Sequence, residues 1–168
     1  TSQPAPAGLS RCPHWWVNYS GGDSATQHYT VNQTVGLLLL FLSESVEVSG
    51  PEWLTIMAEH VQRPEVGAVG ARLLSPEGTI EHAGIVVAMN GTAQPAFRGF
   101  PAEHPGANRQ LQVTRNCSAV SSACLLTRRD VFQQVGGFDD SLSGALADVY
   151  LCLKMRHAAF PSVSIPFA

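Results

Sequence analysis

Apolar positions fall into short blocks separated by polar stretches, a pattern typical of a chain that alternates strands with helices. The longest block, residues 35–42 (VGLLLLFL), shows no alternation, which predicts a strand buried on both faces of a sheet. Residues 66–74 and 79–89 predict two strands that the turn at residues 75–78 (SPEG) joins into an antiparallel hairpin. Two shorter strands are predicted at residues 121–127 and 163–165.

Helix signals lie between these strands. Ser49, followed by Pro51 and Glu52, predicts a helix with Ser49 as its N-cap that ends before Pro64. A short helix is predicted at residues 129–135, closed by Gly136-Gly137, and a last helix at residues 148–158. The first helix would turn an apolar face to the sheet, formed by Trp53, Ile56, Met57 and Val61. The expected fold class is α/β, with helices beside a mixed sheet and an added hairpin.

The length of 168 residues predicts one domain, which we place at residues 17–168 after a Pro- and Ala-rich lead-in at residues 1–16. Residues 90–110 contain three prolines, three glycines and no periodicity. A structureless stretch of that length is uncommon in a compact domain and is usually functional, so it could form a lid or an acceptor-binding loop.

Composition excludes several classes of protein. The formal charge is −3 and no basic run occurs, which argues against nucleic-acid binding and against a polybasic membrane anchor. An apolar run of eight residues is too short for a transmembrane segment, which needs about 20. The four cysteines have no metal-site spacing, so we expect buried, reduced thiols in a cytoplasmic protein. The motifs of Rossmann dehydrogenases, P-loop enzymes, zincins and serine hydrolases are missing from the sequence.

Acidic residues supply the first candidates for chemistry. Glu44 and Glu47 follow the strand at residues 35–42, and ligands of open α/β sheets bind outside the carboxyl ends of strands. The two glutamates could therefore bind a divalent cation, or they could lie in a solvated turn. Asp148, near the start of the last helix, could accept a proton from an alcohol, or it could be an N-cap.

Basic and aromatic residues supply the second set. His82 could contact a substrate or serve as a structural hydrogen-bond partner. Trp15 and Trp16 could stack on a sugar or pack in the core. Three arginines surround the long loop and could hold phosphate or sugar hydroxyls, or serve solubility: Arg98, Arg109 and Arg115.

Taken in order, these segments resemble the family 2 glycosyltransferases of the GT-A fold, especially the bacterial rhamnosyltransferase-like branch. The resemblance covers most of residues 35–168 and extends to the order and spacing of the segments. The matching stretches are LLLLFLSESVEVSGPEWL (37–54), RPEVGAVGARLLSPEGTIEHAGIVV (63–87), AFRGFPAEHPG (96–106), RNCSAVSSACLLTRRDVFQQVGGFDD (115–140) and ADVYLCLKMRHAAF (147–160).

The resemblance implies transfer of a sugar from a nucleotide diphosphate donor to a hydroxyl of a saccharide acceptor, with inversion at the anomeric carbon. The family's acidic metal motif falls on Ser43-Glu44-Ser45, where one acid is kept, so Glu44 with Glu47 would hold Mn²⁺ or Mg²⁺. Asp148 falls on the family's catalytic base and Tyr150 replaces its second aspartate. His82 and the three arginines would contact substrates.

Compared with the family, the chain has no counterpart of the first nucleotide-binding strands and none of the later His-containing segment. The resemblance therefore implies a partial GT-A domain, the central and acceptor-side part of a transferase. Two alternatives to an enzyme follow. One is a non-catalytic remnant that binds a saccharide or a protein, with an open sheet edge that favours a homodimer. The other is a regulator that binds a nucleotide or sugar phosphate.

Overall fold

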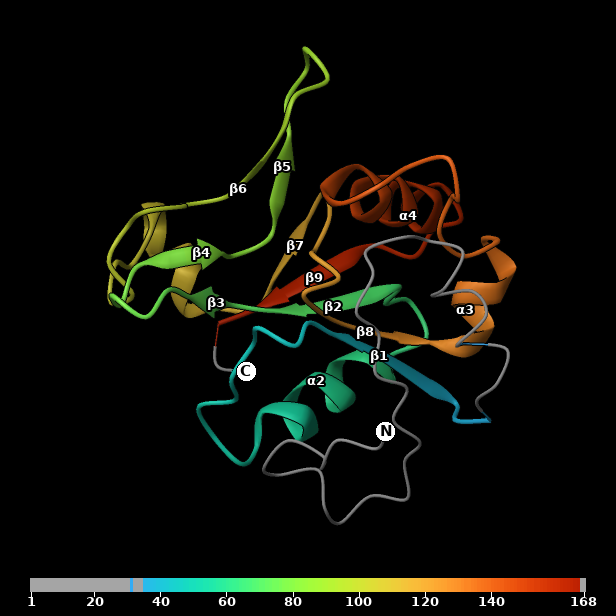
Figure 1. The fold of residues 1–168 in the computed structure, drawn as a ribbon, viewed down its shortest axis with the longest axis horizontal. Coiled ribbons are helices and arrows are strands. Elements are labelled where there is room, and N and C mark those ends of the chain that lie inside the picture. The colour runs from blue at the N-terminus through green and yellow to red at the C-terminus, as the bar shows by residue number, and fades with distance from the viewer. Residues whose placement is uncertain (1–30, 32–34, 167–168) are drawn as a thin grey trace.

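The computed structural model describes residue 31 and residues 35–166, and the predictions for residues 1–16, including Cys12, Trp15 and Trp16, lie outside that part. Its centre is a mixed five-stranded sheet in the order β1-β8-β2-β9-β7 (Figure 1). Strands β2 and β9 are parallel, and every other neighbouring pair in this sheet is antiparallel. The strands are β1 (Leu38–Leu42), β2 (Ala68–Ala71), β7 (Arg115–Cys117), β8 (Cys124–Arg128) and β9 (Ser162–Ile165).

Helices cover both faces of this sheet. Helix α2 (Trp53–Val61) lies against one face and α4 (Ala145–His157) against the other, while α3 (Arg129–Gln134) continues from β8 (Figure 1). Each face has its own apolar cluster, one built around α2 and one around α4. The α/β prediction is confirmed. In the part of the chain that the structure describes, no helix is long and apolar enough to cross a lipid bilayer.

The predicted hairpin is only partly correct. Residues 66–74 divide into β2, which stays in the main sheet, and β3 (Leu73–Leu74), which pairs with β4 (Ile80–His82). The returning strand breaks at Gly84, whose φ of +83° is not compatible with continuous strand geometry, and resumes as β5 (Ile85–Val87). The long loop is not structureless either. It contains β6 (Ala93–Pro95), paired with β5, and begins a 3₁₀ helix, η1 (Ala107–Gln112).

Two local predictions are wrong. In β1 only Leu39 is buried, because β1 is the outermost strand of the described sheet rather than a central one. Helix α2 begins at Trp53 with Glu52 at the N-cap position and no side-chain cap bond, so Ser49 does not cap it. The predicted inner face of α2 is confirmed at its three buried residues, Trp53, Met57 and Val61.

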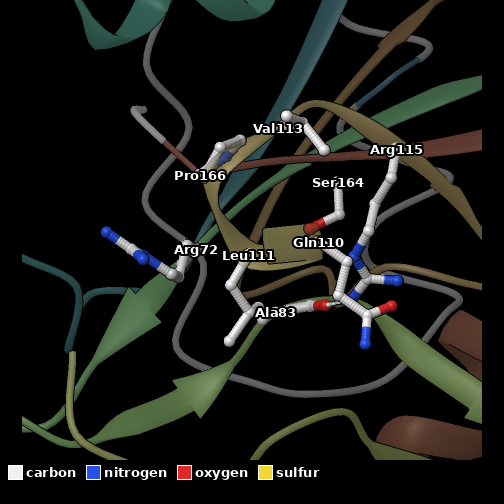
Figure 2. Close-up of a pocket in the computed structure, with 8 residues that line it drawn as sticks. All are labelled: Arg72, Ala83, Gln110, Leu111, Val113, Arg115, Ser164 and Pro166. Carbon is white, nitrogen blue, oxygen red and sulfur yellow. Dashed lines mark hydrogen bonds between the residues drawn. The ribbon is translucent and has the colours of Figure 1, made fainter. Parts of the chain in front are cut away.

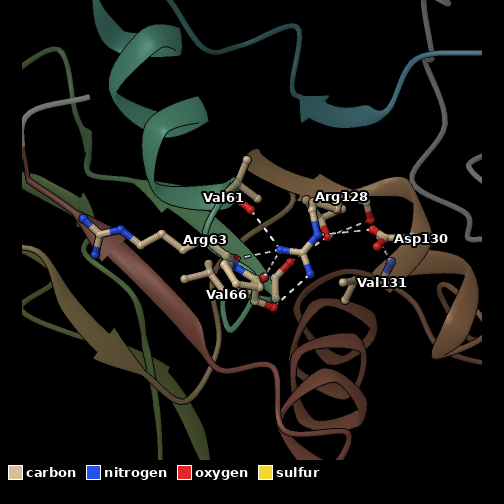
Figure 3. Close-up of polar contacts among 9 residues, drawn as sticks. Val61, Arg63, Val66, Arg128, Asp130 and Val131 are labelled. Atoms are coloured by element: carbon tan, nitrogen blue, oxygen red, sulfur yellow. Dashed lines mark hydrogen bonds and ion pairs between the residues drawn. The ribbon is translucent and has the colours of Figure 1, made fainter.

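Arg128, at the end of β8, ties the connection between α2 and β2 to the sheet. Its Nη1 donates to the carbonyl oxygens of Val61, Arg63 and Val66 at 3.0, 2.8 and 3.0 Å, and its Nη2 donates to that of Pro64 at 3.1 Å (Figure 3). These carbonyls include the end of a helix, where backbone acceptors have no partner within the helix. One guanidinium therefore fixes where α2 ends and β2 begins.

A close approach at Gly70 of β2 places a functional segment. A Cβ at Gly70 would lie 2.5 Å from the Cβ of Val120, a distance that real contacts do not show. Val120 and Ala119 belong to the apolar cluster on the α4 face, so the segment between β7 and β8 crosses the sheet beneath α4. The missing side chain at Gly70 is what lets this segment lie flat on the sheet and deliver residues 121–123 to the start of β8.

Candidate functional site

The ends of five strands form one edge of the sheet. Leu42, the last residue of β1, pairs with Cys124, the first residue of β8, and Gly70 near the end of β2 pairs with Leu125. Because β9 is parallel to β2, its carboxyl end also lies at this edge, beside the start of β7. Ligands of α/β sheets bind outside such carboxyl ends. The backbone N–H of Ser43 donates to the carbonyl of Ala123 at 2.9 Å and joins two of the segments that leave this edge.

Asp148 is fixed to this edge by the segment that crosses Gly70. Its carboxylate oxygen Oδ2 accepts hydrogen bonds from the backbone N–H of Ser122 at 3.0 Å and from the Oγ–H of Ser121 at 3.2 Å. Ser121 Oγ in turn accepts the N–H of Ala123 at 3.2 Å. The N-cap alternative is wrong, because Gly144 occupies the N-cap of α4 and Asp148 lies inside the first turn, bonded to another segment.

Burial sets the protonation behaviour of Asp148. The residue is 5% exposed, and loss of solvent raises the pKa of its carboxyl group. Hydrogen bonds from Ser122 and Ser121 to the carboxylate act in the opposite direction and lower the pKa, but burial dominates. A raised pKa makes the ionised carboxylate a better proton acceptor than an exposed aspartate.

Glu44 and Glu47 are exposed in the turn that follows β1. Ser43 and Ser45 share a hydrogen bond between their hydroxyls at 2.8 Å, which holds the backbone around Glu44. Within residue 31 and residues 35–166, no group of three or more His, Cys, Asp or Glu side chains comes together that could hold a metal ion. Mg²⁺ is usually bound by one or two carboxylates together with substrate phosphates, so carboxylate is the ligand chemistry that such a cation takes.

Three of the four predicted substrate-binding residues gather around β4. Burial, and secondarily the positive charge of Arg98, lower the pKa of His82, so the ring is neutral near pH 7. Arg98 forms an exposed ion pair with Glu81 at 3.1 Å. Arg115 donates to the carbonyl of Ala83, directly after β4, and its guanidinium lies 6.0 Å from the centre of the Phe97 ring.

Arg109, the fourth predicted residue, is exposed on η1, in backbone with a φ of +58°. Asp148 lies on α4 and Arg115 begins β7 of the main sheet, whereas His82 lies on β4, Arg98 in the loop after β6 and Arg109 on η1. The predicted site residues are therefore spread over several elements, and only Arg115 among the four basic residues belongs to the main sheet.

A small pocket opens beside Arg115 (Figure 2). It offers about 10 Å³, room for about one water molecule, so it is not a sugar pocket. In Figure 2 the Arg115 guanidinium and the Gln110 amide lie side by side near Ala83, while Arg72 extends away from them. Arg72 donates to the carbonyl of Ala102 at 3.2 Å, which ties the end of β2 to the loop.

Sequence reasoning missed the residues that hold Asp148. It assigned Ser121 and Ser122 to a strand, whereas β8 begins only at Cys124. Adjacent small polar residues immediately before an apolar run were the available signal, since such residues bond to nearby backbone and polar groups rather than extend a strand. Arg72 and Glu81 were also missed, because their partners lie on segments far away in the sequence.

Comparison with known proteins gives the following similarities. No protein-family model matches the chain. An uncharacterised protein of Sinorhizobium fredii, y4gI, is 41% identical over 146 residues, which cover 86% of this chain and 16% of that protein. The O-antigen biosynthesis protein RfbC of Myxococcus xanthus is 44% identical over 134 residues, covering 79% of this chain and 10% of that protein. The chain thus spans a small part of the length of both relatives.

Two further similar proteins are named as glycosyltransferases. The N-acetylglucosaminyl-diphospho-decaprenol L-rhamnosyltransferase of Mycobacterium tuberculosis is 28% identical over 127 residues, covering 71% of this chain and 41% of that protein. The mannosyltransferase PcManGT of Pyrobaculum calidifontis shares the fold with a TM-score of 0.58 at 12% identity, covering 87% of this chain and 34% of that structure. The chain therefore shares the fold of a GT-A-type glycosyltransferase and is similar to glycosyltransferases over part of their length.

Proposed function

We propose that this chain is the acceptor-side part of a glycosyltransferase that moves a sugar from a nucleotide diphosphate donor to a hydroxyl of a saccharide acceptor. The observation that carries the proposal is the position of Asp148. A buried carboxylate with a raised pKa is bonded to the segment that leads into β8, next to the turn that holds Glu44. Perturbed carboxyl groups of this kind cluster at functional sites.

In this proposal Asp148 acts as the general base. Its carboxylate accepts the proton of the acceptor hydroxyl while that oxygen forms a bond to the anomeric carbon of the donor sugar. The bond between the anomeric carbon and the diphosphate oxygen breaks on the opposite side, so the configuration inverts. Ser121 and Ser122 hold the carboxylate in one orientation through their hydrogen bonds, which favours a single direction of proton transfer.

Glu44 and Glu47 are the residues that would hold Mn²⁺ or Mg²⁺ at the donor diphosphate. A bound cation supplies neutralisation of the charge that develops on the leaving group. The mannosyltransferase with the shared fold was solved in complex with GDP-Man and Mn²⁺, which supports a nucleotide-sugar donor and a divalent metal for this group. His82, Arg98, Arg109 and Arg115 are the proposed substrate contacts, and a cytoplasmic location remains a prediction.

Calorimetric titration with UDP, dTDP and GDP, each with and without Mn²⁺, tests the donor site. Binding that requires Mn²⁺ supports the proposal. The Glu44→Gln variant should then bind the nucleotide more weakly in the presence of Mn²⁺, because a neutral amide is a weaker ligand for a hard cation. Absence of heat with every nucleotide would overturn an enzyme made of this chain alone and favour a saccharide- or protein-binding module.

Turnover tests the base. Once a donor is found, Asp148→Asn should lower kcat by about a hundredfold or more, the usual scale of general-base catalysis, and leave nucleotide affinity unchanged. Asp140→Asn is the matched control, because Asp140 is an exposed aspartate in the loop that precedes the same helix. Equal rates for the two variants would show that Asp148 is not the base.

A further inference from the structure

Three aromatic rings gather in the loop after β6. We call Phe97, Phe100 and His104 the aromatic platform. The ring centres of Phe100 and His104 are 4.6 Å apart and those of Phe97 and Phe100 are 5.9 Å apart, both edge-to-face. Phe100 is 45% exposed, although it is a large apolar residue that contacts the other two rings. The platform is thus an apolar surface that the fold leaves open to solvent.

The backbone holds the platform rigidly. The N–H of Ile80 on β4 donates to the carbonyl of Phe100 at 2.7 Å, and the N–H of Gly99 donates back to the carbonyl of Ile80 at 2.8 Å. Phe97 has a φ of +59°, a conformation that bulky residues rarely adopt and that costs free energy unless surrounding contacts enforce it. These contacts fix the loop that exposes Phe100, and a binding surface that is already fixed loses less conformational entropy when a ligand binds.

Two planar charged side chains, Glu81 on β4 and Arg98 in the same loop as the platform, form an ion pair. The Nε and Nη2 atoms of Arg98 both lie 3.1 Å from Oε2 of Glu81. The two side chains are 65% and 45% exposed, so the ion pair adds little to stability. Arg98 follows Phe97 in the chain, and Glu81 follows Ile80, whose N–H donates to the carbonyl of Phe100, so the exposed ion pair lies next to the platform along the backbone.

We propose that the aromatic platform and the Glu81–Arg98 pair together bind a pyranose ring of the saccharide acceptor. A pyranose has an apolar face of C–H groups, which packs on aromatic rings, and a rim of hydroxyls, which bond to planar side chains such as carboxylate and guanidinium. The inference rests on the proposed function for the class of its ligand. The platform and Asp148 lie on separate elements, so the test includes disaccharides as well as single sugars.

Saturation-transfer NMR on the whole chain tests the platform without donor, metal or turnover. The probes are methyl glycosides of glucose, N-acetylglucosamine and L-rhamnose, each with a disaccharide of the same sugar. We expect transfer from aromatic protons to the C–H protons of at least one sugar, and tighter binding of its disaccharide. Phe100→Ala should weaken that binding about tenfold, the scale of a lost aromatic contact.

Leu74→Ala is the matched control, because Leu74 lies on β3 of the same small sheet and is 46% exposed. Glu81→Gln keeps the shape of the surface, removes one charged acceptor and should also weaken binding. Absence of transfer to every probe, or equal affinity in Phe100→Ala and the wild type, would overturn the inference. This experiment uses neither donor nor metal, so a chain that binds no nucleotide can still bind the probes, and failure of the enzyme and failure of the platform give different results.

Discussion

Asp148 is expected to make stability depend on pH. Its pKa in the folded protein lies above the value of 3.8 that an unperturbed aspartate has, because the carboxyl group is buried. As the pH rises through 3.8, the unfolded chain releases this proton before the folded one does, so ionisation favours the unfolded state. The residue thus lowers stability progressively above pH 3.8, until the pH passes its folded pKa.

The Asp148→Asn variant removes this titration. We expect its free energy of unfolding, relative to the wild type, to increase from pH 4 upward and then level off. Urea denaturation at half-unit steps of pH measures the difference. Asp139→Asn is a contrasting control, since hydrogen bonds from Ser141 lower the pKa of that aspartate, and its relative stability should fall slightly as the pH rises to 3.8 and stay level above it. A difference for Asp148→Asn that stays flat with pH would contradict the burial argument.

Substitution of Arg128 is expected to destabilise the connection between α2 and β2, which lies outside its own strand. Arg128→Ala leaves the carbonyls of the α2–β2 connection without their charged donor and should lower the free energy of unfolding by about 2 kcal/mol or more. Arg128→Lys should recover part of this loss, because one ammonium cannot reach all the acceptors of a guanidinium. Thermal unfolding followed by circular dichroism measures both variants.

Asp130 provides the control for that experiment. Its ion pair with Arg128 spans 3.3 Å, but its side chain is 76% exposed, and exposed pairs contribute about 0 to 1 kcal/mol. Asp130→Asn removes the charge and keeps the oxygen that accepts the N–H of Val131. A loss of stability in Asp130→Asn as large as that in Arg128→Ala would show that the ion pair, not the carbonyl contacts, carries the effect.

Asp148 and Glu44 could be predicted as candidates from the sequence, because an acidic residue near a helix start or a strand end can be identified without the structure. The residues that form hydrogen bonds to Asp148 could not be predicted. Ser121 and Ser122 reach it only because the segment between β7 and β8 crosses the sheet over Gly70, and that crossing depends on contacts 50 residues apart. The pairing of Glu81 with Arg98 depends in the same way on a break at Gly84 that redirects the chain.

At the scale of elements, the crossing at Gly70 predicts a sharp effect of a small substitution. Gly70→Ala places a methyl group 2.5 Å from the Cβ of Val120, so the crossing segment must lift away from the sheet. We expect a loss of about 1 to 3 kcal/mol, the range for overpacked cores. The same movement should loosen Ser121 and Ser122 from Asp148 and lower any transferase activity more than the change in stability alone would explain.

Gly50→Ala is the matched control for this substitution, because a Cβ at Gly50 meets no atom within 4 Å. Its stability should stay within about 0.5 kcal/mol of the wild type, as for most surface substitutions. Chemical denaturation compares the two variants. If Gly70→Ala were as stable as Gly50→Ala, the segment between β7 and β8 would have to lie elsewhere than on the sheet.

The sequence predicted the helices better than the position and pairing of the strands, for a physical reason. Helices α2, α3 and α4 have buried faces or closing glycines that are local properties of the sequence. An apolar run such as β1 shows that a strand exists, but the same residues suit a central and an outer strand, so its position in the sheet was predicted wrongly. The returning strand of the predicted hairpin divides into β4 and β5 because Gly84 permits a turn that the surrounding pattern conceals, and β6, the partner of β5, comes from the predicted loop at residues 90–110.

For the molecule as a whole, the three free cysteines of the described part agree with the expectation of reduced thiols. Cys117 is half-buried, Cys124 and Cys152 are buried, and burial raises the pKa of their thiols to about 12, 11 and 11. Thiolates are therefore scarce near neutral pH. The sheet is held by packing on both faces rather than by covalent links, and β1 and β7 are the two outer strands of the described sheet.

The outer side of β1 predicts how the molecule associates. Within residue 31 and residues 35–166, no strand pairs with the outer side of β1, which carries five consecutive large apolar residues and no charge. Val35 and Leu37, just before it, are each 84% exposed. An apolar outer strand is a template for pairing with another chain. We expect sedimentation velocity to show a dimer that increases with concentration, and Leu37→Lys to shift the equilibrium toward monomer because a charge there opposes close approach.

Val113→Lys is the control that separates this edge from a general effect of charge. Val113 is 53% exposed and lies beside β7, at the opposite side of the sheet from β1, so its substitution should leave the dimer unchanged. If both lysine variants weakened association equally, net charge rather than the β1 edge would govern it. A wild-type chain that stays monomeric at every concentration would mean that β1 is already covered, and the homodimer prediction would then be wrong.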